Sequence, residues 1–541
     1  MSIFDRFATD KNRWWALVFL AVGLAIVIID NTVLNVAIPY ILRDLSASLD
    51  GIQWVVSGYA LIIATLLILA GRLGDIFGRR KIFVIGIVLF AVGSFIASIA
   101  KSIGILFLGE AIIEAIGAAG MLTSSLSLLV SEFQGRERAI AFGVWGSVAG
   151  ASATVGPLLG GYFTTYHSWR WSLRINVVVA VIAILGSVFI KESKGEASRG
   201  RFDVLGTVLS GLGLFSLVFG FIEAQKYGWW NALQVFKLGS WSLSFGTLSI
   251  VPVAFAVSLC LLAWFVFHEI RIERQGGSPL LRMSMFHNKS FSFGLVTLLI
   301  IALGQFGVFF ILPIFLQNVL GLTALGTGVV FLSSSLTVMI VGPLSGFLAA
   351  KFGIKSVITV GMIASVIGTF WLALSINPNA TGWSLAPAFI MFGIGVGATA
   401  AQLTNLVLSS VRVSLAGEAS AINNTIRQVG TSIGIAILGT VLASMIGSNL
   451  GQNINSDRVI PDDQKSQIIS SISSNSVESG ESEAVQKYGG DLLVGLAVKN
   501  DVNAALTQSA KDALNTAGVF VLLGTICSFF IPTSITNHEE N

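Results

Sequence analysis

The sequence predicts an all-α polytopic membrane protein, and three observations support this prediction. Of the 541 residues, 54% are hydrophobic and only 11% are charged, whereas soluble globular proteins average about 25% charged residues. The mean hydropathy is +0.83. Apolar runs long enough to cross ~30 Å of hydrocarbon as helices of about 20 residues recur along the chain. Together these observations exclude a soluble enzyme, a disordered chain and a secreted disulfide scaffold.

Polar stretches, glycines and prolines divide the chain into fourteen candidate spans. A first group of six lies near residues 14–42, 51–71, 82–100, 104–131, 139–163 and 175–190. A pair follows near residues 204–222 and 241–267. The last group lies near residues 291–316, 324–349, 356–375, 384–410, 419–445 and 514–534. We expect the first span to be retained, because its apolar run is longer than the core of a signal peptide.

An internal repeat predicts how the spans are organised. Residues after the second span match residues after the tenth at Gly71/Gly346, Leu73/Leu348, Phe77/Phe352 and Gly78/Gly353. Since eight spans separate the two segments, the simplest interpretation is two six-helix halves with one extra pair between them. We expect a first half over 1–190, an inserted pair with linkers over 191–290 and a second half over 291–541. Parallel repeats are typical of transporters that rock around a midplane site.

The distribution of Lys and Arg predicts the orientation. With the N-terminus inside, the inner segments contain 20 of these residues and the short outer loops contain 6. The positive-inside rule therefore places both termini in the cytoplasm of a cell membrane. The segment 446–513 is predicted to be a long extracellular loop. Loops of this length are usually functional or disordered, and a lid over the outer mouth is one role open to it.

The glycine-rich loop after the second span points to a family. Asp75 lies among basic residues between glycines that permit a tight turn. The segment Gly71 to Lys81 resembles the cytoplasmic signature loop of the major facilitator superfamily. The resemblance implies a gating loop formed by Gly71, Asp75, Gly78, Arg79 and Arg80. It implies that Asp75 caps a helix in the other half and that Arg79 pairs with an acid, for which Glu132 and Glu137 are candidates. A basic topology anchor is the alternative.

The fifth span resembles the antiporter motif of the same superfamily. Its sequence contains Gly150, Gly156, Pro157, Gly160 and Gly161. Small residues let helices approach closely, and a proline bends a helix by removing a backbone hydrogen bond. Such a span can close one half against the other and limit leak. Ordinary glycine-rich packing is the alternative.

Further segments resemble the fourteen-span drug:proton antiporters. They are Ile29 to Pro39 in the first span, Trp169-Arg170-Trp171 with Ile175-Asn176, Phe315-Leu316-Gln317, and Arg427-Gln428 with Gly430. The resemblance covers nearly the whole chain. It implies a major facilitator fold and proton-coupled multidrug efflux.

Acidic residues within the spans are the candidate proton and cation site. Asp30 lies roughly 24 Å along the helix from Trp14, at 1.5 Å per residue, and an acid at that depth is a functional-site hypothesis by default. Glu110 and Glu114 lie on one face of the fourth span, because positions i and i+4 are neighbours. The alternatives are structural acids at Asp30 and Glu114 and a water-facing acid at Glu110. Ala111 stands where the family usually has an arginine, so the resemblance does not settle how protons are coupled.

Other polar residues could line the rest of a cavity, although helix–helix hydrogen bonding is equally consistent with them. They are Asn31, Asn35, Gln305, Gln402, Asn405 and Arg427. The net charge of +4 is small and its basic residues are scattered, which argues against a nucleic-acid partner. We find no P-loop, metal-ligand cluster or HExxH motif in the sequence, and so expect neither an enzyme nor a metal or other cofactor.

The sequence therefore predicts a secondary transporter that exports lipophilic, cationic compounds from the cytoplasm by alternating access. The proton is the expected coupling ion, the expected partners are the substrates and membrane lipids, and we expect a monomer. Two alternatives stay open. One is proton-coupled export of a neutral or anionic endogenous metabolite, and the other is a membrane sensor that transports nothing.

Overall fold

The computed structural model describes residues 12–133, 135–194, 203–238, 241–277, 279–411, 416–474 and 492–532. These residues are almost entirely helical, as predicted. Thirteen helices in this described part are long and apolar enough to cross a membrane. The 32-residue helix α7 (Gly135–Tyr166) is not among them but coincides with the fifth predicted span, so the number of fourteen crossings stays a prediction.

The first half contains the helices of the first six predicted spans. They are α2 (Arg13–Asp44), α3 (Leu49–Phe77), α4 (Arg79–Ser98), α5 (Ile103–Leu106), the π-helical segment η2 (Phe107–Glu114), α6 (Ala115–Glu132), α7, α8 (Trp169–Gly186) and the 3₁₀ turn η3 (Ser187–Phe189). Side-chain caps fix several helix starts: the hydroxyl of Ser48 accepts the Gly51 N–H, and the hydroxyl of Ser168 accepts the Arg170 N–H. Such caps satisfy backbone donors that the first helical turn leaves unpaired.

The inserted pair and the second half follow. The pair consists of α9 (Val204–Tyr227), β1 (Phe236–Leu238), β2 (Trp241–Leu243) and α10 (Ile250–Arg274). The second half contains η4 (Met283–His287), α11 (Lys289–Asn318), α12 (Ala324–Phe352), α13 (Ile354–Ser375), η5 (Gly382–Leu385), α14 (Ala386–Ser409), α15 (Ala416–Ser456), α16 (Asp462–Ser474) and α18 (Leu492–Phe529).

The eighth predicted span began too early. Residues 241–243 instead form β2, which pairs antiparallel with β1 so that Phe236 lies opposite Leu243. Helix α10 begins only at Ile250, where the Ser249 hydroxyl accepts the N–H of Val251. The apolar side chains before Ile250 extended the hydropathy signal without belonging to the helix.

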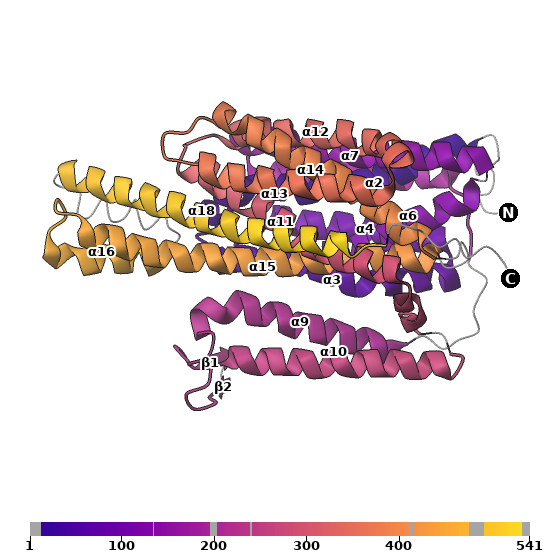
Figure 1. Cartoon of the computed structure of the whole chain (residues 1–541), viewed down its shortest axis with the longest axis horizontal. Coiled ribbons are helices and arrows are strands. Elements are labelled where there is room, and N and C mark those ends of the chain that lie inside the picture. The colour runs from indigo at the N-terminus through magenta and orange to yellow at the C-terminus, as the bar shows by residue number, and fades with distance from the viewer. Residues whose placement is uncertain are drawn as a thin grey trace.

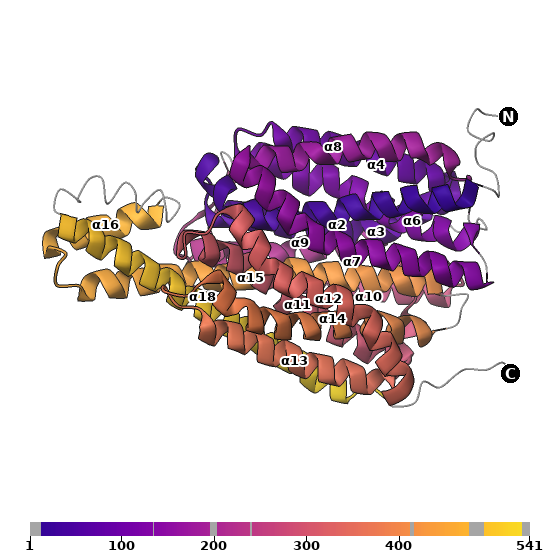
Figure 2. The ribbon, with the colours of Figure 1, turned by 90° about the horizontal axis from the view of Figure 1, so that it is seen from above.

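The two halves pack their helices in the same pairs. Helix α2 packs on α7 and α8 as α11 packs on α15 and α18, and α4 packs on α6 and α8 as α13 packs on α14 and α18. The halves lie side by side (Figure 2) and meet along two seams, α7 with α12 and α3 with α15. This pairing agrees with the internal repeat in the sequence.

The inserted pair lies beside the bundle (Figure 1), with α9 against the seam between α3 and α15. The Trp54 indole on α3 donates to Glu223 Oε1 on α9 at 2.9 Å. On the other side of the seam, the Thr440 hydroxyl on α15 donates to the Phe221 carbonyl of α9 at 2.8 Å. Helix α9 is therefore tied to both halves.

The predicted long loop is largely helical where it is described. Helix α15 continues to Ser456 and α18 begins at Leu492, so with α16 they project beyond the bundle (Figures 1 and 2). Val494, Val498 and Val502 are buried at four-residue spacing, which places them on one helical face. The high content of Ser, Asn and Gln obscured this stripe. The described parts of the segment extend the last two spans as a helical projection.

The hydrophobic core joins the halves mainly at the end toward this projection. One cluster contains Ile38 and Ile41 of α2 together with Phe310, Phe331 and Leu438 of the second half. Near the starts of α2 and α11, the buried members of each cluster belong to one half only. The halves are thus most closely packed at the end opposite the start of α2.

Candidate functional site

Three acidic side chains meet inside the first half. Asp30 comes from α2, and Glu110 and Glu114 come from η2. Their exposed fractions are 0%, 1% and 0%, and one carboxyl oxygen from each lies within 4.8 Å of the other two. The structure therefore brings the predicted acids together. The alternative in which Glu110 faces water does not hold.

Small residues allow η2 to approach its neighbour closely. A Cβ atom added to Gly93 of α4 would lie 2.5 Å from the Glu114 nitrogen, and one added to Gly109 of η2 would lie 2.6 Å from the Ala97 nitrogen. Any larger side chain at either glycine would push the two helices apart. Segment η2 is also π-helical, a geometry that occurs frequently at functional sites.

Two polar side chains from other helices contact the cluster. The Asn176 amide on α8 donates to Asp30 Oδ1 at 2.6 Å and to the Ser94 hydroxyl on α4 at 3.2 Å. Neither residue was predicted to belong to the site. The sequence offered one signal for Asn176, an amide within a predicted span, and no signal for Ser94.

The acid cluster lies within the first half rather than between the halves. Segment η2 packs on α3, α4, α5 and α6, all in the first half. No Lys or Arg occurs in the middle of the first six spans. Buried carboxylates that lack a basic partner are costly, so the arrangement can take up protons or a desolvated cation. A change in the charge of Asp30 would act on its own helix α2, which also contacts α11 and α12 of the second half.

The gating loop is held by residues that follow the sixth span. Gly78 adopts φ +119°, a backbone conformation that favours glycine. The Arg79 N–H donates to the Ser193 carbonyl at 2.9 Å, and the Arg80 N–H donates to Glu192 Oε1 at 3.0 Å. Glu192 was not predicted, and its position directly after a span gives no sequence signal for this contact.

The remaining loop predictions have different outcomes. The Arg79 guanidinium donates to the Ser127 carbonyl at 3.3 Å. Glu137 accepts from Arg13 at 2.6 Å. The surroundings of Gly71 are open, since an added Cβ would meet nothing closer than Thr123 Cβ at 3.9 Å. The Asp75 side chain lies outside the described part of the structure, so its capping role stays a prediction.

The antiporter motif lies where α7 meets both halves. An added Cβ on Gly156 would overlap the Thr32 side chain of α2, and one on Gly160 would lie 2.9 Å from Val33 Cα. An added Cβ on Gly161 would lie 2.7 Å from the Ala324 carbonyl oxygen and from Leu325 Cα of α12. These glycines permit the close α7 contacts that the motif predicts. Pro157 belongs to the same stretch of α7, and the surroundings of Gly150 lie outside the described structure.

The other predicted polar residues do not form one cluster. Asn35 donates to the Asn31 carbonyl at 2.9 Å within α2. Gln402 donates to the Ser345 hydroxyl at 3.0 Å and accepts from Asn405 at 3.4 Å, all within the second half.

Gln305 and Arg427 are the other two polar residues predicted to line a cavity. Gln305 of α11 is 7% exposed. The side chain of Arg427 is exposed on α15 and donates to Asn424 at 3.0 Å.

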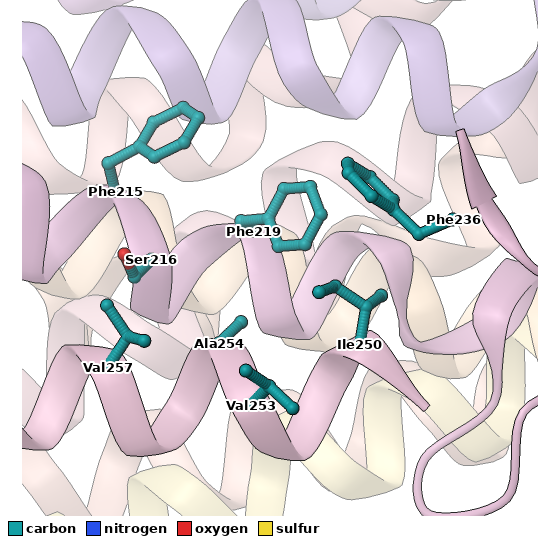
Figure 3. A pocket seen from close by; sticks show the side chains of 8 residues that line it. All are labelled: Phe215, Ser216, Phe219, Phe236, Ile250, Val253, Ala254 and Val257. Carbon is teal, nitrogen blue, oxygen red and sulfur yellow. The ribbon is translucent and has the colours of Figure 1, made fainter. Parts of the chain in front are cut away.

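A groove of about 240 Å³ lies between α9 and α10 near β1. Figure 3 shows its lining side chains, which are Phe215, Ser216, Phe219, Phe236, Ile250, Val253, Ala254 and Val257. Apart from the Ser216 hydroxyl, these described side chains are apolar. The groove can make mainly apolar contacts, whereas the acid cluster contains groups that can bind protons or a cation.

The helical bundle with two similarly packed halves defines a class of membrane transporter. The profile of the Major Facilitator Superfamily matches residues 20–435, and the chain belongs to this family. It is therefore a multi-pass membrane transporter and not an enzyme, which confirms the predicted family and fold.

The chain is similar to several resistance and export proteins. The puromycin resistance protein pur8 of Streptomyces alboniger is 33% identical over 435 residues, covering 80% of this chain and 82% of the relative. The tetracenomycin C resistance and export protein of Streptomyces glaucescens is 31% identical, covering 79% and 75%. The multidrug resistance protein Stp of Mycobacterium tuberculosis is 30% identical, covering 86% and 82%.

Solved structures show the same fold. A bacterial homologue of the human lysosomal transporter Spinster, in an inward-facing and unoccupied conformation, aligns with TM-score 0.61 at 15% identity, covering 97% of this chain and 99% of that one. A D-xylose–proton symporter aligns with TM-score 0.55 at 14% identity, covering 79% and 90%.

Proposed function

We propose that this transporter exports lipophilic, cationic compounds from the cytoplasm in exchange for protons. It would act as a monomer in a cell membrane, with both termini cytoplasmic and no resident cofactor. The observation that carries the proposal is the cluster of Asp30, Glu110 and Glu114, three carboxyls that are at most 1% exposed within 4.8 Å of one another. Relatives described as resistance and export proteins support the choice of substrate class.

The cluster would serve as the protonation site. Asp30 is bonded to Asn176 of α8, and its own helix α2 contacts the second half through the Gln317 amide of α11, which donates to the Val36 carbonyl at 2.8 Å. Loss or gain of a proton changes the charge inside the first half. That change can alter the position of α2 relative to α11, which links protonation to the packing between the halves.

The packing of the halves supports alternating access. The shared cluster with Ile38 and Phe331 joins them at the end toward the projection, whereas the clusters near the start of α2 stay within one half. With the termini cytoplasmic, the structure would be closed toward the outside. Ligands that favour one of two such states shift their populations according to their differential affinity.

Export of a neutral or anionic endogenous metabolite is a second candidate. The enclosure of the acids within the first half favours it, because they would then bind protons without touching a bulky substrate. Competition experiments separate the candidates: a cationic inhibitor should reduce transport more strongly than its neutral isostere if the substrate is a cation. Equal inhibition by both would favour the metabolite exporter.

Everted vesicles with an acidic interior test the proposal directly. We expect the unmodified chain to accumulate a fluorescent cationic dye, and Asp30→Asn and Glu114→Gln to abolish gradient-driven accumulation because each removes a protonation site. Asp462→Asn is the matched control, since Asp462 is exposed in α16. Normal accumulation in both cluster variants would overturn the site assignment.

A further inference from the structure

The oxygens of the acid cluster are spaced as the ligands of a metal ion are. Two oxygens bound to one Ca²⁺ can lie at most about 4.6–5.2 Å apart, twice the Ca–O distance of 2.3–2.6 Å. The cluster contributes one oxygen from each of Asp30, Glu110 and Glu114 within 4.8 Å. If two carboxylates bind through both oxygens and the third carboxyl, still protonated, binds through its carbonyl oxygen, they supply five of the 6–8 ligands that Ca²⁺ takes.

A fourth oxygen lies beside the carboxyls. Tyr59 of α3 is 3% exposed, and its hydroxyl has no hydrogen-bond partner among the described residues. The phenol interacts electrostatically with all three acids. Its ring packs in the cluster that contains Val27 of α2 and Ala111 of η2. A buried hydroxyl without a partner is costly, and a bound cation would provide it with one.

Some carboxyl oxygens also lack a donor among the described residues. They are Asp30 Oδ2 and Glu110 Oε2, while the Glu114 carboxyl interacts with the Ser94 hydroxyl of α4. Asn176 satisfies only Asp30 Oδ1. The described neighbours therefore leave some buried carboxyl oxygens without a donor, and protons or a cation can bind these oxygens.

We propose that Asp30, Glu110 and Glu114, with the Tyr59 hydroxyl, form a binding site for a hard divalent cation of the size of Ca²⁺ that exchanges with protons. The inference rests on the proposed function, because it assigns a second occupant to the same acids. An all-oxygen ligand set suits Ca²⁺ rather than softer transition metals. Mg²⁺ fits less well, because it gives up its water reluctantly and the acids are buried.

Charge balance gives the stoichiometry. Three carboxyls are neutral when they hold three protons. They are also neutral when they hold one divalent cation and one proton. Each cation that enters therefore releases two protons, and each cation that leaves takes up two, so that no net charge is left in the buried site in either state.

Proton release from the purified full-length chain in lipid nanodiscs tests this exchange. In weak buffer with a pH indicator, CaCl₂ should saturably release two protons per bound Ca²⁺, while choline chloride of equal ionic strength releases none. Glu114→Gln should raise the CaCl₂ concentration needed for half-maximal release, because a charged ligand is lost while the two remaining acids still release two protons per ion. Asp462→Asn should leave the release unchanged. Equal release by NaCl would overturn the divalent assignment, and no release by CaCl₂ would overturn the inference.

Tyr59→Phe tests the fourth ligand while keeping the ring that packs in the core. Loss of an outer-shell partner of a metal ligand typically costs about 10–100-fold in affinity. Because Tyr59 is a direct ligand in this proposal, we expect at least about a tenfold weaker affinity for Ca²⁺, with two protons still released per ion. Unchanged affinity would remove Tyr59 from the site. Dye accumulation distinguishes the two proposals: dye transport without Ca²⁺ exchange contradicts only the cation site, and Ca²⁺ exchange without dye transport contradicts only the proposed function.

Discussion

The two halves pair their helices alike, but glycines of α7 and α12, the two helices that meet along one seam, have different surroundings. In the first half, Gly160 and Gly161 are in close contact with the backbone of α2 and α12. In the second half, a Cβ added to Gly342 or Gly346 of α12 would meet no atom within 4 Å. The α7 glycines thus permit close packing on α2 and α12, whereas Gly342 and Gly346 of α12 make no close contact.

The difference follows the position of each glycine along the α7–α12 seam. Gly161 lies on the α7–α12 seam, toward the end at which one core cluster joins both halves. Gly346 lies near the other end of α12, in open surroundings. Glycine permits close approach of helices, and of these four glycines only Gly160 and Gly161 use that property here.

The largest effect expected from this comparison is at Gly161. Its added Cβ would lie 2.7 Å from the Ala324 carbonyl oxygen and from Leu325 Cα. These are backbone atoms that cannot rotate away, so we expect Gly161→Ala to lower the free energy of unfolding by about 2–3 kcal/mol, the upper range for overpacking. The midpoint of thermal unfolding of the purified protein measures this.

Gly346→Ala is the matched control, because its surroundings are open. Substitutions away from tight packing usually change stability by no more than about 0.5 kcal/mol. If both variants lose the same free energy of unfolding, the closer surroundings of Gly161 have no energetic consequence. We also expect Gly161→Ala to increase chemical labelling of cysteines introduced along the α7–α12 seam.

Hydropathy patterns predicted most of the fold because each span must be apolar over its own length. They failed where side-chain composition and backbone structure diverge. Residues 241–243 lie close before the apolar run of α10 but form a strand, and Val494 lies on an apolar stripe within a polar segment. Local composition cannot distinguish these cases, because the packing partner decides them.

The candidate site was predicted only in part. The sequence identified Asp30, Glu110 and Glu114 as acids within the spans, and the structure brings them together. Asn176 and Tyr59 could not be assigned. They come from other spans, and hydropathy does not give the rotation of a helix about its axis. The π-helical geometry of η2 adds a local change of phase that spacing alone does not predict.

A smaller difference in stability is expected between alanine variants of the paired loop glycines. Gly78 and Gly353 both have positive φ, +119° and +85°, so alanine strains each by about 1–3 kcal/mol. A Cβ on Gly78 would also lie 2.7 Å from the Glu192 carboxyl carbon, whereas one on Gly353 meets nothing within 4 Å. We expect Gly78→Ala to cost about 1 kcal/mol more than Gly353→Ala, the worth of one disturbed hydrogen bond.

Combining the loop substitutions with Glu192→Ala measures that difference. Without the carboxylate, Gly78→Ala and Gly353→Ala should lower the unfolding midpoint by similar amounts. If Gly78→Ala remains more costly by the same margin, the contact with Glu192 does not explain the asymmetry of the two loops.

The smallest effects are expected at two ion pairs in corresponding positions of the halves. Arg13 at the start of α2 pairs with Glu137 of α7 at 2.6 Å, and Arg282 before α11 pairs with Glu418 of α15 at 3.0 Å. The four side chains are 32–45% exposed. Exposed pairs contribute about 0–1 kcal/mol, so we expect Glu137→Gln to lower the free energy of unfolding by no more than about 1 kcal/mol at pH 7.

Glu418→Gln should have still less effect at pH 7. Burial raises the pKa of Glu418, although Arg282 and Arg72 oppose the shift. An acid whose pKa is raised on folding stabilises the protein below its unfolded pKa and loses that contribution as the pH rises through the folded value. At pH 7 Glu418 therefore adds little, and replacing it should change the free energy of unfolding by less than about 0.5 kcal/mol. Unfolding midpoints at pH 4, 5.5 and 7 measure this; a loss at Glu418 larger than that at Glu137 at pH 7 would show that its ion pair outweighs its burial.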